Sequence, residues 1–248
     1  MTMLPSKLLV LSLFCVATGA SAQAIFTDTF SGSTIDSAKW ASTTPFSDSS
    51  IAVSSSLASF SNGSGLLTQT GFSQPIEIAF SFAFTGTSHD SFRIVTRADA
   101  FSSVGYGVVN GVAASFRIQE DTGNLSGNIA LEDNGAVLAT ATVALSLNTW
   151  YTARLQDDGV SLSLYWAADT NPLITAAVSS AYGNRVATFN REGAGNNSTI
   201  SAGSVSSIDY ITVTSIPEPG AYGLVFSSVM AVGALRGRCK RAASICRA

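Results

Sequence analysis

The stretch "PIEIAFSFAFT", residues 75–85, has an apolar side chain at every second position. Because side chains of a β-strand point to opposite faces in turn, one face of this segment carries only isoleucine and phenylalanine. These residues are Ile76, Ile78, Phe80, Phe82 and Phe84. The other face carries Glu, Ala, Ser and Thr. The pattern predicts a strand with one face in a hydrophobic core.

Similar alternation recurs on both sides of this stretch. "NTWYTARLQDDGVSLSLYW" (148–166) predicts a hairpin, with Asp158-Gly159 as its turn. Three further strands are expected, "SFRIVTRA" (91–98), "ASFRIQE" (114–120) and "SIDYITVT" (207–214). No segment of the body shows helical spacing of apolar residues, and clusters of Gly, Asn, Asp and Ser separate the strands. We therefore expect an all-β fold.

The expected architecture is a two-sheet antiparallel jelly-roll sandwich over residues 23–214. The segments 49–65 and 191–204 are rich in Ser, Gly and Asn, and we expect them to be loops or weak edge strands. The chain has 248 residues, and a single domain of this size buries enough apolar surface to fold.

The charge of the body narrows the classes of partner. Residues 23–216 carry seven basic and fifteen acidic side chains, a net charge of −8. This excess of acid argues against nucleic acid, whose phosphates require a basic surface. The three cysteines, Cys15, Cys239 and Cys246, all lie near the ends, so the body has neither a disulfide framework nor a cysteine-based zinc site.

The first 22 residues have the three parts of a secretory signal peptide. Lys7 provides a positive charge, residues 8–16 are apolar, and Ala20 and Ala22 are the small residues that signal peptidase accepts. Cleavage is expected after Ala22, with the position after Ala24 as the second choice. A buried N-terminal helix is the alternative interpretation.

The end of the chain also has three parts. Pro217 and Pro219 end the folded domain, because proline neither extends a helix nor donates to a sheet. Residues 221–235 are apolar or small, and as a helix they would span only about 22 Å, short of the roughly 30 Å of a bilayer core. A basic cluster follows, formed by Arg236, Arg238, Lys240 and Arg241. This order predicts a transient inner-membrane anchor with the body outside.

Residues 215–241 resemble the PEP-CTERM sorting signal of bacteria. The resemblance rests on Pro217, Glu218, Pro219 and Gly220, followed by the apolar stretch and the basic cluster. It implies that exosortase recognises the motif, removes the tail and passes the body to the cell envelope or extracellular matrix of an exopolysaccharide-producing bacterium. The tail 242–248 departs from the family, which usually ends soon after its arginines. The alternative is an ordinary C-terminal anchor.

The body resembles concanavalin A-like lectin/glucanase domains. "FTDTFSGSTIDSAKW" (26–40) is similar to their opening strand and loop, and 147–166 to the late hairpin of laminin-G-like members. The resemblance implies a jelly roll whose concave face often binds glycan, so a polysaccharide ligand is expected. It also implies a structural calcium between the first and last strands, for which Asp28 and Asp209 are candidates.

Laminarinase-type members of this superfamily carry Glu-x-Asp-x-x-Glu on one strand, where both glutamates reach the cleft. The acidic neighbours here are consecutive instead, at Glu120-Asp121, Glu132-Asp133 and Asp157-Asp158. We expect them to be solvated turn residues, and we therefore expect no catalytic residue and a non-catalytic body. The alternatives are a glycan-cleaving enzyme with an unfamiliar catalytic set, tested at Glu120 and Glu132, and a purely structural surface protein.

Other single residues carry little chemistry. His89, the only histidine, lies between two expected strands and suits a local polar role. The glycines of 105–111 lack the pattern of a dinucleotide loop. Several aromatic residues could stack on sugars, although most are expected in the core. They are Trp40, Trp150, Tyr151, Tyr165 and Trp166, with Tyr106 and Tyr182 in expected loops.

Overall fold

The computed structural model describes residues 22–45, 49–86, 90–101, 110–121, 124–190 and 205–216, with backbone only at 119–121 and 124–126. These residues form strands and turns without a helix, arranged as two antiparallel sheets. The predicted all-β sandwich is therefore confirmed. Ala20, His89, Tyr106, the motif at 217–220 and the basic cluster at 236–241 lie outside the described residues. Within the described part of the chain, no helix has the length and apolar character needed to span a membrane.

One sheet is built around β6 and is called the β6 sheet. Its strands, in spatial order, are β13 (Ile174–Ala177), β12 (Ser161–Trp166), β11 (Tyr151–Asp157), β6 (Ile76–Phe84), β15 (Val205–Ser215), β4 (Leu57–Ser61) and β3 (Ser50–Ser54). Strand β1 (Gln23–Asp28) also pairs with β15, along the final part of that strand.

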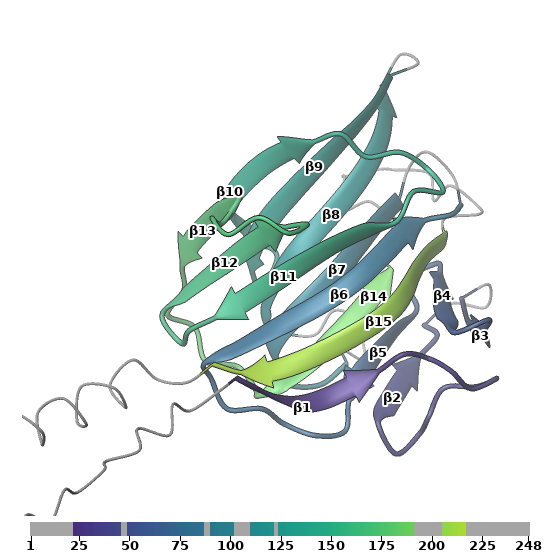
Figure 1. Cartoon of the computed structure of the whole chain (residues 1–248), viewed down its shortest axis with the longest axis horizontal. Helices are drawn as coiled ribbons and strands as arrows, with labels where there is room; N and C mark the ends of the chain where they lie inside the picture. Colours follow the sequence, from purple (N-terminus) through teal and green to yellow (C-terminus); the bar gives the residue numbers. More distant parts are fainter. Residues whose placement is uncertain are drawn as a thin grey trace, which may run out of the picture. The chain divides into compact units, whose positions relative to one another are not determined.

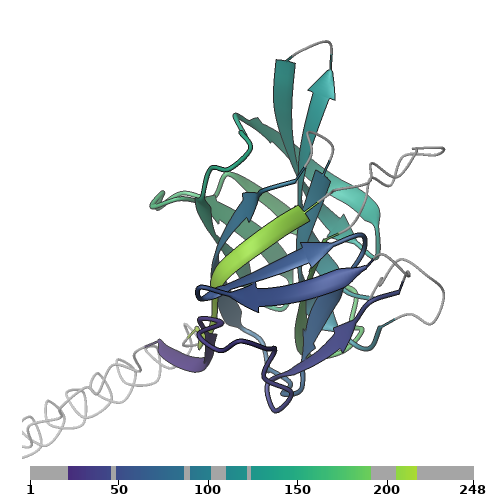
Figure 2. The ribbon, with the colours of Figure 1, turned by 90° about the vertical axis from the view of Figure 1, so that its right-hand side faces the viewer.

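The other sheet is called the β8 sheet, and Figure 1 shows it behind the β6 sheet. Its strands, in spatial order, are β10 (Ala136–Val143), β9 (Asn124–Asp133), β8 (Val112–Asp121), β7 (Asp90–Ala98), β14 (Arg185–Asn190), β5 (Gly65–Thr68) and β2 (Trp40–Thr43). The far ends of β8 and β9 project beyond the rest of the sandwich (Figures 1 and 2).

The core lies between the two sheets and is rich in phenylalanine. The five apolar residues that alternate along β6 are at most 1% exposed. The ring of Phe82 lies 4.6 Å from that of Phe116 on β8 and 5.1 Å from that of Phe92 on β7. The period-two pattern of residues 75–85 therefore marks the centre of the fold.

The prediction for residues 49–65 needs correction. Strand β3 is an edge strand, as expected, but β4 lies inside the β6 sheet and β5 lies inside the β8 sheet. The reason is burial: Phe60 and Leu66 are fully enclosed in the core, and this outweighs the surrounding Ser and Gly.

The two ends of the sandwich lie side by side. Gln23 at the start of β1 pairs with Ser215 at the end of β15. The ladder closes with a hydrogen bond from the Ile216 amide to the Pro75 carbonyl, 3.0 Å long. The folded unit Ala22–Ile216 thus begins and ends at one place.

Candidate functional site

The outer face of the β8 sheet, turned away from the core, carries the candidate site. Register sets its side chains in rows across the strands, because opposite residues of an antiparallel pair share a face. One row joins Val95, Ala113, Glu132 and Val137. The next joins Arg93, Ser115, Ala130 and Thr140, and the third joins Ser91, Arg117, Asn128 and Thr142.

Glu132 forms a buried ion pair with Arg93 on this face. Both side chains are at most 7% exposed, and Nη2 of Arg93 lies 2.8 and 3.1 Å from the two carboxylate oxygens. Arg93 also donates from Nε to Oγ of Ser115 at 3.3 Å, and its guanidinium lies 5.9 Å from the Phe189 ring centre. The site therefore holds a carboxylate in a fixed position with a cation beside it.

The prediction that Glu132 is a solvated turn residue is wrong. The turn lies further along, at Asn134 and Gly135, which both have positive φ. Glu132 still belongs to β9, and alternation places it on the outer face while Leu131 enters the core. The sequence did offer one sign of this pair, which is Arg93 near the middle of β7. An arginine buried in a strand requires a carboxylate beside it.

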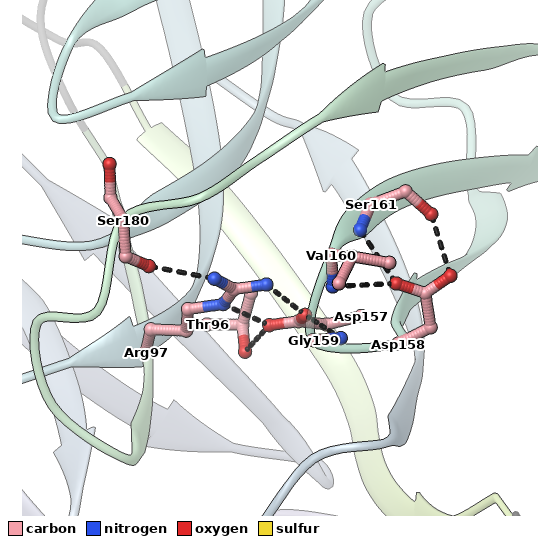
Figure 3. A network of polar contacts seen from close by, with 8 residues as sticks. All are labelled: Thr96, Arg97, Asp157, Asp158, Gly159, Val160, Ser161 and Ser180. Atoms are coloured by element: carbon pink, nitrogen blue, oxygen red, sulfur yellow. Dashed lines mark hydrogen bonds and ion pairs between the residues drawn. The ribbon is translucent and has the colours of Figure 1, made fainter.

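Asp157 forms a second buried pair, which links the two sheets (Figure 3). Its carboxylate accepts hydrogen bonds from Arg97 at 2.6 and 2.9 Å and from Thr96 at 3.0 Å. Arg97 has φ of 54°, in a bulge where β7 shifts register against β14, so that both Thr96 and Arg97 reach Asp157. The hydrogen bond to Asp157 raises the pKa of Arg97 despite its burial.

The two residues of the Asp157-Asp158 pair therefore have different roles. Asp157 is fully buried, which contradicts the turn prediction for it, because it ends a strand with its side chain on the core side. Asp158 is an exposed turn residue, as predicted, and accepts hydrogen bonds from the amides of Val160 and Ser161 (Figure 3).

Asp133 also differs from the prediction, because it is half-buried and accepts hydrogen bonds from Ser180 and from the Tyr182 hydroxyl. The hydrogen bond to Asp133 raises the pKa of Tyr182. Tyr182 is thereby held by the protein itself. It is not a free platform for a sugar ring.

The other aromatic candidates lie mostly in or against the core. Trp40 is 2% exposed, and Tyr151 and Trp166 pack around Phe82. Tyr165 lies under the Arg154 guanidinium, 4.6 Å away. Trp150 is 43% exposed and stays available for stacking.

The proposed calcium ligands do not fit a calcium site. Both carboxylate oxygens of Asp28 accept hydrogen bonds from N–H donors, from the Trp40 indole at 2.6 Å and from the Phe30 amide at 3.0 Å. Lys39 approaches the same carboxylate at 3.5 Å. Asp209 lies in β15 where its register against β6 shifts. The described residues bring no group of three metal-binding side chains together.

Glu120 and Glu132 do not form a catalytic pair by themselves. Glu120 pairs with Leu125, whereas Glu132 pairs with Ala113. Glu120 and Ala113 are seven residues apart along β8, which is about 23 Å. Glycosidase carboxylates lie about 5 to 10 Å apart.

Comparison with known proteins gives the fold but no close relative. No family model matches the chain, and no curated protein matches it. One similar solved structure is a glycosyl hydrolase family 16 protein from Mycobacterium smegmatis, with 14% identity over 77% of this chain and 100% of that one and a TM-score of 0.53. Another is an immunostimulatory antigen and pseudo-β-1,3-glucanase of Mycobacterium tuberculosis, with 12% identity over 78% of this chain and 99% of that one and a TM-score of 0.53. A third is an endo-β-galactosidase from Clostridium perfringens, with 11% identity over 79% of this chain and 63% of that one and a TM-score of 0.51.

These comparisons correct the expectation of a non-catalytic body. The sandwiches that this chain resembles include glycan-cleaving enzymes, so the fold gives no ground for excluding catalysis. At identities this low the likeness establishes the fold alone, a jelly-roll sandwich of two antiparallel sheets. The roles of single residues have to come from the chain itself.

Proposed function

We propose that this chain is an exported protein whose β-sandwich cleaves glycans on the outer face of the β8 sheet. The observation that carries the proposal is Glu132, a carboxylate buried on that face and held by Arg93. The glycoside hydrolases with the same sandwich support the reaction class.

The arrangement suits one of the two roles in glycoside hydrolysis. The nucleophile or general base in this reaction is a carboxylate, and the ion pair with Arg93 holds the Glu132 carboxylate in one position. The hydrogen bond from Arg93 to Ser115 fixes the guanidinium, and thereby the orientation of Glu132. Among the described side chains on the strands of the β8 sheet, Glu132 is the one carboxylate on the outer face, so its acid partner belongs to another part of the chain.

Export is the second part of the proposal. Signal peptidase would act after Ala22, and exosortase at Pro217–Gly220, with the basic cluster at 236–241 as the stop. The position of the sandwich supports this, because its ladder runs from Gln23 to Ser215. Cuts at these two sites would leave every described strand whole. The mature body would then reside in the bacterial envelope or matrix.

The test of cleavage is the release of reducing ends by the purified full chain. The substrates are β-1,3-glucan, β-galactan and the exopolysaccharide of the source cell. We expect Glu132→Gln to lower the rate by about 100-fold or more. Glu77→Gln is the matched control, because Glu77 forms an ion pair with Arg154 at 2.9 Å in the β6 sheet. Equal losses in both variants, or no release by the wild type, would overturn the proposal.

A further inference from the structure

The outer face of the β8 sheet is divided into a filled half and an open half. Over β5, β14, β7 and the start of β8 an apolar cluster is buried, with exposures of at most 6%, and Phe101 packs against it. Its members are Leu67, Val95, Ala98, Ala113, Ala187 and Phe189. These apolar side chains offer no hydrogen-bonding group to a sugar.

The open half lies over β8, β9 and β10, and we call it the polar shelf. It consists of Arg117, Asn128, Ala130, Thr140 and Thr142, all half-buried or exposed. Three of its side chains, Asn128, Thr140 and Thr142, are short and polar, Ala130 is small, and Arg117 is long and charged. Hydroxyl and amide groups of this kind donate to and accept from sugar hydroxyls.

Arg117 differs from most other cations of the sandwich. Lys39, Arg93, Arg97 and Arg154 each form an ion pair with a carboxylate. Arg117 forms none within the described part of the chain, although the body is strongly acidic. Register places Asn128 directly beside it on β9. A half-exposed guanidinium next to an amide donor is suited to bind a planar or tetrahedral anion.

Arg117 is too far from Glu132 to act on the same sugar. Glu132 lies opposite Ala113, four residues from Arg117 along β8, which is about 13 Å. An anion at Arg117 would thus belong to a different sugar unit of the same glycan chain.

We infer that the polar shelf binds anionic glycans, with Arg117 and Asn128 holding a carboxylate or sulfate group on a sugar away from the cleaved bond. This inference rests on the proposed function for the cleavage step, but the binding it describes can be measured without cleavage. The bound charge comes from a uronate or from a sulfate ester, and the probes below separate the two.

The experiment measures binding of the full-length Glu132→Gln variant to three oligosaccharides by calorimetry. The probes are an oligogalacturonate, its methyl ester and a sulfated oligogalactan. We expect at least one charged probe to bind about tenfold or more tightly than the neutral ester, and the preference to weaken with added salt. Adding Arg117→Ala should abolish the preference for the charged probe, and Arg117→Lys in its place should restore part of this preference. Arg185→Ala should leave the preference unchanged. Arg185 is the control because it also lacks an ion pair among the described residues.

The outcomes separate the inference from the proposed function. Equal binding of charged and neutral probes, no binding of any probe, or a preference that survives Arg117→Ala would overturn the inference. A preference that depends on Arg117, in a protein that releases no reducing ends, would support the inference and count against cleavage. If neutral glycans were cleaved at a rate that Arg117→Ala does not change, and charged and neutral probes bound equally, the proposed function would hold and the inference would be wrong.

Discussion

Asp157 is the residue whose loss should cost the fold most. It is fully buried, and it bonds Arg97 and Thr96 across the two sheets. We expect Asp157→Asn to lower the free energy of unfolding by about 3 to 5 kcal/mol, because the Arg97 charge stays buried without its partner. Urea titration measures the loss.

Asp158 provides the control for this prediction. It is the next residue, but it is exposed and bonds only within its turn. Asp158→Asn should cost about 1 kcal/mol or less. If both variants lost the same stability, the claim that the Arg97–Asp157 pair joins the sheets would be wrong.

Asp158 also predicts a pH dependence. Partial burial raises its pKa, but hydrogen bonds from Ser161 and Val160 and the charge of Arg97 outweigh burial and lower it below its ordinary value of 3.8. A carboxylate whose pKa is lower in the folded than in the unfolded protein stabilises the fold at pH values above its unfolded-state pKa. This contribution is lost as the pH falls through its folded-state pKa. The wild type should therefore lose more stability than Asp158→Asn as the pH falls from about 5 to about 2. Parallel stability curves would contradict this.

At this scale the sequence predicted Asp158 correctly and missed Glu132, Asp133 and Asp157. Adjacency of two acids suggested turns, but of these four residues only Asp158 is an exposed turn residue. The missing information was the partner. Arg93 and Arg97 lie in β7, all of whose residues are buried, and each required a buried carboxylate that no local pattern identifies.

The contact of β5 with β14 leaves no space for a side chain at Gly65. A Cβ added at Gly65 would meet the side chain of Phe189 and lie 2.9 Å from the Thr188 carbonyl oxygen. We expect Gly65→Ala to destabilise the fold by about 1 to 3 kcal/mol, since backbone must move to accept the methyl group. Thermal unfolding measures the effect.

Gly32→Ala is the comparison for this substitution. A Cβ at Gly32 meets only backbone atoms of Thr34, the nearest at 3.3 Å, and the residue is exposed. It should change stability by about 0.5 kcal/mol or less. A Gly65→Ala protein as stable as Gly32→Ala would show that β5 and β14 pack less tightly than described.

Strands with strict alternation were predictable, and short ones were not. β6, β11 and β12 bury every second residue, which the sequence displays directly. β4 and β5 have only five and four residues among serines and glycines. Their place inside the sheets is decided by a few buried side chains such as Phe60, which is a property of the tertiary structure.

For the whole molecule, processing at both ends is the testable consequence of the proposed export. The mature chain from its native cell surface should begin at Gln23, because Gln23 and Ala24 belong to the ladder with Ser215 and Thr214. It should also lack Cys239 and Cys246. Intact-mass measurement decides this. A chain that retained Cys246 would contradict sorting by exosortase, and one that began at Ile25 would have lost the first pairs of β1.

A crystal structure of the Glu132→Gln variant with a bound oligosaccharide would locate the glycan site directly. We expect sugar on the outer face of the β8 sheet, over β8, β9 and β10, with one ring against residue 132 and a charged group at Arg117. Sugar bound instead to the outer face of the β6 sheet, for example at Arg154 and Tyr165, would contradict this expectation.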